Sequence, residues 1–246
     1  MKMKSFFLGV VLIFSAQISF AQFGDFLKKA EQKVSSITKG GGLSQDEVGN
    51  GLKEALNVGL SEATDFLSAK DGYFLSPYKI LVPVEAQNVV SKLKMVPGFN
   101  NVEADLTERM NRAAEDAAVK AKPIFISAIK KMSFGDAMSI LTGDKDAATQ
   151  YLQRTTSADL VAAFKPIIQE SLDKVNARTY WREAVSAYNK IPFVSKTNPE
   201  LDDHVTTTAL QGMFSLIAKK ELAIRSDVSL RNTDLLKKVF AKQDKK

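Results

Sequence analysis

Hydrophobic residues recur along most of the chain at intervals of three and four positions, the spacing that places side chains on one face of an α-helix. The clearest apolar stripe falls in the segment 101–121 and consists of Leu106, Met110, Ala113, Ala114, Ala117 and Ala121. Because alanine is small, another helix can approach this stripe closely. No stretch alternates apolar and polar residues for long enough to predict a sheet. The pattern therefore predicts an all-α fold.

Capping residues divide this pattern into a compact bundle of about seven to ten helices, several of them short. Residues whose side chains accept hydrogen bonds from the free N–H groups of a first helical turn are expected at the helix starts. These residues are Ser44, Asn101, Ser133, Asp144, Ser157, Asp202 or Asp203, and Thr233.

Glycine and proline mark the interruptions of the helical pattern. Asp71-Gly72 is expected to end the first helix of the domain, and Pro123 is expected to kink or restart a later one. The apolar segment 79–84 contains Pro83, which disfavours a central strand, so we expect an ordered loop across the bundle surface. A short helix is expected over about 85–95, and the longest loop over 191–200.

The N-terminus has the pattern of a secretory signal peptide. Two lysines precede a short apolar run, residues 6–14, and Ser19-Phe20-Ala21 places small residues at the two recognition positions of a cleavage site. The apolar run is too short to span a bilayer comfortably. We therefore expect residues 1–21 to be removed before Gln22, and the mature protein to reside in the periplasm or cell envelope.

An amphipathic segment follows the signal peptide, and we divide the mature chain accordingly. Its apolar stripe within 23–39 consists of Phe23, Phe26, Leu27, Ala30, Val34 and Ile37. Three glycines at 40–42 form a hinge, so residues 22–42 are a tethered segment that either docks on the domain or contacts a membrane or a partner. A single helical domain is predicted over 43–240, and a disordered basic tail over 241–246.

Composition excludes several classes of function. The 246 residues include no cysteine and one histidine, which excludes a thiol nucleophile, a cysteine-ligated metal site and a histidine-rich one. Without the signal peptide the net charge is +4, which is too mild to require a polyanionic partner. The lysines are scattered rather than interleaved with aromatics, so no nucleic acid is expected as a partner. We expect neither a metal nor another cofactor.

The single histidine, His204, is the one residue on which a Ser-His-Asp triad would depend. It follows Asp202 and Asp203 at a predicted helix start, where a solvated capping turn is the usual explanation. Adjacent residues on a helix do not converge on one ion, so these three do not predict a metal site. The sequence gives no catalytic residue.

Polar residues on the predicted long helix suggest a candidate site. Asn111, Arg112 and Glu115 lie close together on it, and on a buried helix such groups need partners. Candidate partners from other helices are Asp136, Arg154 and Glu221. These six residues form the candidate polar cluster, which is either structural or a ligand site.

Five runs of residues, together with the start of the domain at 51–56, resemble one protein family. They are MNRAAEDAA (110–118), AKPIF (121–125), ILTGDKDAATQYLQRTTS (140–157), LDDHVTTTALQGMF (201–214) and LLKKVF (235–240). The chain is similar in these runs to the bacterial domain-of-unknown-function family 4197. The resemblance implies an exported or envelope protein of Gram-negative bacteria with a helical fold, and it implies no activity.

Three functional hypotheses follow. The first is a non-enzymatic envelope protein that binds an unidentified partner or small ligand through a groove between helices. The second is a hydrolase or lyase that uses carboxylates such as Glu115 or Asp136. The third is a protein attached peripherally to a membrane through residues 23–39. Several acids with raised pKa values in a cleft would favour the enzyme, whereas an apolar cleft would favour ligand binding.

Overall fold

The computed structural model divides the chain into two units, Met1–Gly42 and Leu43–Lys246. It describes residues 44–83, 87, 90–91, 101–190, 192–193, 196–231, 237 and 239–240. The predictions for the signal peptide, the segment 22–42 with its stripe, and the tail 241–246 lie outside the described residues. So do most of the helix expected over 85–95 and the cap expected at Thr233.

The described part of the second unit contains seven α-helices, a short 3-10 helix and no strand, which confirms the all-α prediction. The helices are α2 (Gln45–Ser68), α4 (Val102–Ala118), α5 (Ala121–Lys131), α6 (Phe134–Thr142), α7 (Ala147–Asp173), α8 (Ala177–Tyr188) and α9 (Leu201–Ser226), followed by η2 (Val228–Leu230). None of the helices in these residues is long and apolar enough to cross a membrane.

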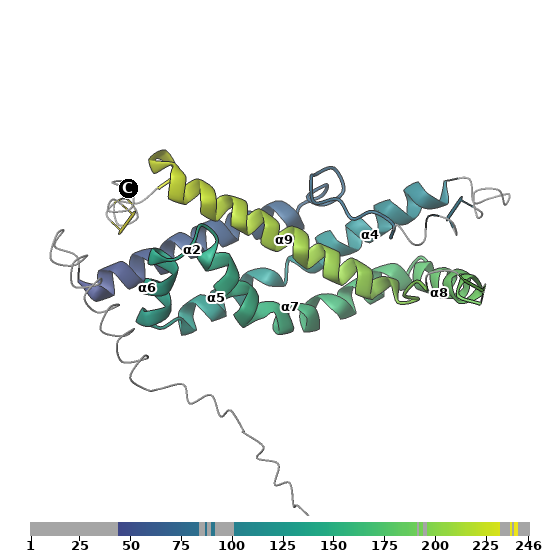
Figure 1. Cartoon of the computed structure of the whole chain (residues 1–246). Helices are drawn as coiled ribbons and strands as arrows, with labels where there is room; N and C mark the ends of the chain where they lie inside the picture. The colour runs from purple at the N-terminus through teal and green to yellow at the C-terminus, as the bar shows by residue number, and fades with distance from the viewer. Residues whose placement is uncertain are drawn as a thin grey trace, which may run out of the picture. The chain divides into compact units, whose positions relative to one another are not determined.

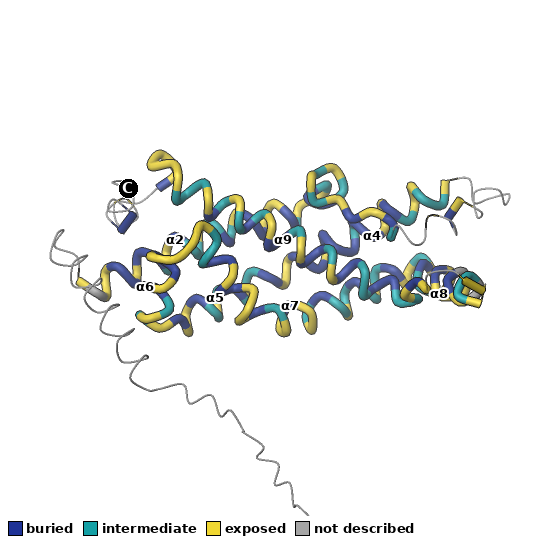
Figure 2. The backbone as a smooth tube through the Cα atoms, viewed as in Figure 1, coloured by how far each residue is buried: buried dark blue, intermediate teal, exposed yellow. Residues whose placement is uncertain are grey.

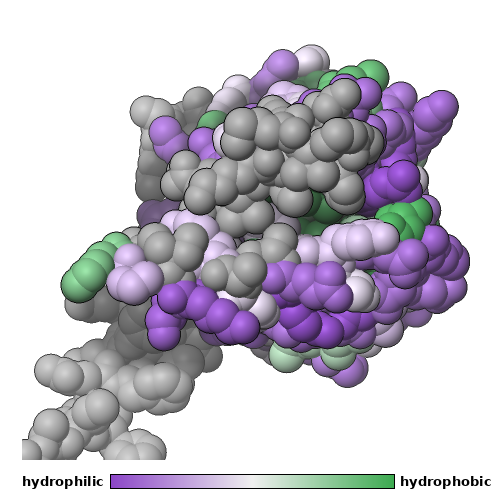
Figure 3. All heavy atoms as spheres, turned by 90° about the vertical axis from the view of Figure 1, so that its right-hand side faces the viewer, coloured by the Kyte–Doolittle hydropathy of each residue, from purple (hydrophilic) through white to green (hydrophobic). Residues whose placement is uncertain are grey.

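Two long helices, α7 and α9, organise the bundle. They pack against each other along much of their length, and α4 packs against α7 (Figure 1). Helix α2 contacts α4, α5, α6 and α9. Figure 2 shows that the buried positions of these helices face one another, while the exposed positions face outward. Seen from the end that carries α8, the described surface is largely hydrophilic (Figure 3).

The core contains the apolar stripes that the sequence predicts. In α4 and at the start of α5, Met110, Ala113, Ala114, Ala117 and Ala121 are fully enclosed, which confirms these members of the predicted stripe. Leu106, its first member, is only half-buried. The enclosed positions of α7 include Leu160, Phe164, Ile168 and Leu172. The ring of Phe125 meets that of Phe214 edge to face at 6.1 Å between centroids.

Several predicted helix boundaries are confirmed. Ser44 and Ser133 form capping boxes at the starts of α2 and α6. Asn101 precedes α4, although its side chain makes no capping bond, and the helix restarts as α5 at Ala121, just before Pro123. After α2 the chain turns through Gly72, where a Cβ atom would lie 2.2 Å from the carbonyl oxygen of Phe66, so only glycine fits.

The caps predicted at Asp144 and Ser157 are wrong, because one continuous helix, α7, begins after Asp146 and passes through both expected segments. Ser157 lies inside α7, where its hydroxyl donates to the carbonyl of Gln153 at 2.6 Å. A serine can satisfy its hydroxyl in this way within a helix, so a serine alone does not mark a helix start.

The cap predicted at Asp202 or Asp203 is also wrong. Helix α9 begins at Leu201, and Glu200 precedes it without a side-chain capping bond. The Asp202 side chain is buried and has partners on two other helices. The Asp202 carboxylate therefore binds side chains of other helices instead of capping α9, as the sequence pattern had predicted.

A candidate binding groove along helix α9

A groove of about 490 Å³ runs along the first three turns of α9. Its described lining residues come from a loop after α2, from the loop before α9 and from α9 itself. They are Pro83, Lys196, Thr197, Asn198, Asp203, His204, Thr207, Thr208 and Gln211. The volume lies in the range of small-molecule sites, and every lining residue except Pro83 carries a polar or charged side chain.

The floor of the groove is a polar face of α9. Positions three, four, seven and eight residues apart lie on one side of a helix, and Asp203, His204, Thr207, Thr208 and Gln211 have this spacing. The opposite face of α9 is apolar and belongs to the core. The floor thus offers hydroxyl, amide and imidazole groups from one rigid element.

One wall is the extended segment 79–83, which two side chains hold in place. Asn111 accepts a hydrogen bond from the Ile80 amide and donates one to the Ile80 carbonyl, both at 2.8 Å. The Nε2 atom of His204 lies 2.9 Å from the Leu81 carbonyl oxygen. Since a carbonyl only accepts, Nε2 carries the proton in this contact. The segment forms neither helix nor strand, as predicted for a loop across the bundle surface.

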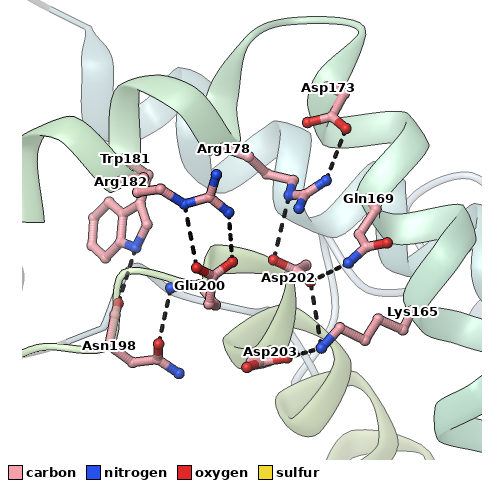
Figure 4. Close-up of polar contacts among 10 residues, drawn as sticks. All are labelled: Lys165, Gln169, Asp173, Arg178, Trp181, Arg182, Asn198, Glu200, Asp202 and Asp203. Atoms are coloured by element: carbon pink, nitrogen blue, oxygen red, sulfur yellow. Dashed lines mark hydrogen bonds and ion pairs between the residues drawn. The ribbon is translucent and has the colours of Figure 1, made fainter.

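The other wall, residues 196–200, is held by α8 and by Asn189, which directly follows α8. The side-chain amide of Asn189 donates to the Thr197 carbonyl and accepts from the Thr197 amide, at 2.8 and 2.9 Å. Trp181 donates from its indole to the Asn198 carbonyl, and Arg182 makes two bonds to the carboxylate of Glu200 (Figure 4). These bonds fix the wall without using the Thr197 hydroxyl, which is buried and has no partner in the described structure.

The carboxylate of Asp202, in the first turn of α9, lies at the centre of a polar network that joins α7, α8 and α9 (Figure 4). Asp202 is 1% exposed, and its Oδ2 accepts a 2.7 Å bond from Gln169. Two cations compensate its charge: Lys165 Nζ lies 3.8 Å from Oδ2, and Arg178 Nε lies 3.4 Å from Oδ1. A buried charge persists when it is paired in this way, so the network anchors the start of α9.

Asp203 is the one acidic residue among the described groove residues, and its carboxylate forms an ion pair with a lysine. Lys165 donates a 2.6 Å hydrogen bond to its Oδ1 atom. This bond, followed by the attraction of nearby carboxylates, raises the pKa of Lys165, so the lysine stays charged. The pair leaves the groove with little net charge on this side.

Three members of the candidate polar cluster hold the loop after α2. Glu115 accepts hydrogen bonds from the amides of Tyr73 and Phe74, both at 3.1 Å, and pairs with Arg112 at 2.8 Å. Arg112 also pairs with Asp71, and Asn111 binds Ile80 as described above. Burial, with a smaller effect of Glu115, raises the pKa of Tyr73 far above its ordinary value; its protonated hydroxyl donates to the Ala209 carbonyl.

The other three members lie in different surroundings. Glu221, on α9, accepts from the amides of Ala148 and Thr149 at the start of α7 and pairs with Arg225. Asp136 completes the capping box of α6. Arg154 lies over the ring of Tyr151 at 5.8 Å. The structure therefore brings Asn111, Arg112 and Glu115 together and gives Asp136, Arg154 and Glu221 separate partners.

Sequence reasoning missed the buried role of Asp202 and the groove along α9. One signal was available: Lys165, Gln169 and Asp173 recur every four residues, as do Arg178 and Arg182. Such spacing indicates a polar helix face, but it does not show which partner that face meets. Among the described residues, no three histidine, aspartate or glutamate side chains are grouped to hold a metal ion.

Comparison with known proteins gives one match. Residues 42–241 match a family described as "Protein of unknown function (DUF4197)". No curated protein and no solved structure matches the chain. The matched range covers α2 to α9 and includes both walls and the floor of the groove.

Proposed function

The chain belongs to the DUF4197 family of proteins of unknown function, whose description offers no activity. We therefore propose a function from the groove. The protein is a non-enzymatic binding protein, exported to the envelope of a Gram-negative bacterium, and it binds a polar ligand or partner segment along α9.

The observation that carries this proposal is a polar groove whose walls are held before any ligand arrives. Both walls are fixed by reciprocal amide bonds, from Asn111 on one side and Asn189 on the other. A preformed site loses little conformational entropy on binding, so more of the contact energy contributes to affinity. The hydroxyl and amide groups of Thr207, Thr208 and Gln211 suit a ligand rich in hydrogen-bonding groups.

The proposed carboxylate-based hydrolase or lyase receives less support. Glu115 already binds two backbone amides and Arg112, and Asp136 binds the backbone and hydroxyl of Ser133. Acid–base chemistry needs a carboxyl group that is free to exchange a proton with a substrate. Both carboxylates instead stabilise local structure, and Asp203 in the groove is bound to Lys165.

Export is proposed from the N-terminal pattern, and it has its own test. If residues 1–21 are a signal peptide, N-terminal sequencing of the protein extracted from the envelope begins at Gln22. Recovery of a chain that begins at Met1 in the cytoplasm would contradict export and leave the binding proposal to be tested separately.

The groove itself is tested by what remains bound to the protein. We propose purifying the native protein and a Thr207→Arg variant, whose long side chain fills the groove, and identifying bound molecules by mass spectrometry. Ser215→Arg is the matched control, because Ser215 is exposed on α9 and does not line the groove. A polar ligand is expected with the native protein and the control, and not with Thr207→Arg. The same bound molecules in all three preparations would contradict the proposal.

A further inference from the structure

A second groove, of about 400 Å³, lies between α5 and α7, away from the residues of the α9 groove. Its lining combines apolar groups, hydroxyl groups and one charge of each sign. The lining residues are Pro123, Ile124, Ser127, Ala128 and Lys131 on α5, and Tyr151, Thr155, Thr156 and Asp159 on α7. The two helices pack directly against each other.

Tyr151 is the most informative of these residues. Its side chain is enclosed, with 8% of the residue exposed, yet its hydroxyl has no hydrogen-bond partner among the described residues. The hydroxyl oxygen is not fully enclosed, so it belongs to the exposed part of Tyr151. Burial, then Asp136, raises the pKa of Tyr151, and Arg154 opposes them weakly. The phenol is thus a protonated donor held at the groove.

Lys131 and Asp159 are the two charged residues of the groove, and both are unpaired. Neither side chain has an ion pair or hydrogen bond within the described part of the chain. They also do not pair with each other. Two opposite charges kept apart in one groove can each bind an opposite charge of a ligand.

The direction of the helices places these charges at opposite ends. Helix α5 runs toward α6, and α7 leaves from α6, so α5 and α7 are antiparallel (Figure 1). Lys131, near the end of α5, therefore lies at the same end as Tyr151, and Asp159 lies at the other. Tyr151 and Asp159 are eight positions apart, which corresponds to about 12 Å along a helix.

From these placements we propose that the α5–α7 groove binds a short peptide with free termini, about three residues long. An extended peptide advances about 3.5 Å per residue, so the charged ends of a tripeptide are about 10 Å apart. Lys131 and Tyr151 bind the carboxylate, and Asp159 binds the amino group. The Ser127 hydroxyl bonds a peptide unit, the Thr155 hydroxyl, which donates to the Tyr151 carbonyl, accepts from another, and Ile124 contacts an apolar side chain.

The proposal predicts which variant loses the preference for the free carboxylate of the peptide and which loses the preference for its free amino group. Trialanine, its N-acetyl form and its C-terminal amide are titrated into the purified protein by calorimetry. Blocking either terminus is expected to weaken binding roughly fivefold, as for an exposed ion pair. Lys131→Met abolishes the preference for the free carboxylate only, and Asp159→Asn abolishes the preference for the free amino group only. Tyr151→Phe weakens trialanine about fivefold, the loss of one hydrogen bond.

Matched controls separate recognition from folding and from the other groove. Lys130→Met and Asp144→Asn remove exposed charges of the same kind outside the groove and are expected to bind as the native protein does. Circular dichroism melting verifies that each variant is folded. Absence of trialanine binding, unchanged terminal preferences in Lys131→Met and Asp159→Asn, or loss of trialanine binding in Thr207→Arg would overturn the proposal.

Discussion

Asp202 illustrates how one residue can determine the geometry of a site at a distance from its own atoms. A carboxylate loses the solvation of water when it is buried, and it needs opposite charge and hydrogen bonds in compensation. Here Lys165 and Gln169 of α7 and Arg178 of α8 supply them. The adjacent residues Asp203 and His204 then reach the groove.

Replacing Asp202 by alanine is expected to lower the free energy of unfolding by about 2–4 kcal/mol, because Arg178 and Gln169 lose a buried partner while Lys165 retains access to water. Asp202→Asn should cost less, since an amide oxygen can still accept from Gln169. The control is Asp203→Ala, which removes an exposed partner of Lys165 and should cost less than about 1 kcal/mol. Urea unfolding measures all three; similar costs at 202 and 203 would contradict the role of burial.

At the scale of elements, helix α7 receives its N-terminal cap from another helix. Asp146 precedes α7 but makes no side-chain capping bond. Glu221 of α9 instead binds the amides of Ala148 and Thr149, and also the Thr149 hydroxyl at 2.8 Å. A carboxylate suits this position because the N-terminus of a helix carries a partial positive charge. The cap thus joins the two longest helices of the bundle.

Glu221→Ala is therefore expected to destabilise the protein by about 2–4 kcal/mol, since two buried amides, a hydroxyl and Arg225 lose their acceptor together. Glu221→Gln keeps an acceptor oxygen and should cost roughly half as much. Hydrogen exchange of the Ala148 and Thr149 amides, measured alongside denaturant unfolding, should accelerate in both variants. Asp146→Ala is the control, and a cost equal to that of Glu221→Ala would show that the local residue is the cap after all.

At the scale of the whole molecule, the α9 groove is assembled from segments that are distant in the sequence. The wall at 79–83 and the floor at 203–211 are separated by five of the described helices. Asn111 and His204 hold that wall, while Asn189 holds the opposite one. The groove consequently depends on the folded domain as a unit rather than on any one motif.

The third functional hypothesis, membrane attachment through residues 23–39, is tested by deleting the segment from the whole molecule. Three glycines at 40–42 are expected to form a flexible hinge, so deleting 23–42 is expected to leave the urea midpoint of the remaining chain within experimental error. If the apolar stripe binds lipid, the deletion also reduces cosedimentation with anionic vesicles, and salt weakens the attachment of the intact chain. A large loss of stability would instead mean that the segment packs on the domain.

The sequence by itself determined the fold class and the starts of α2, α4 and α6, because both depend on local properties. A spacing of three and four residues produces an apolar face wherever it occurs, and the capping boxes at Ser44 and Ser133 form from residues three positions apart. The buried alanine stripe of α4 was predictable for the same reason.

Only the tertiary structure decided which polar residues are structural and which line a site. Asp144, Ser157 and Asp202 have the residue types of helix caps, yet the caps of α7 and α9 depend on Glu221 and on contacts between helices. Half of the candidate polar cluster came together and half did not, because local spacing does not fix which helices become neighbours. Burial then sets the free energy of each polar group, and burial is a property of the assembled fold rather than of the sequence pattern.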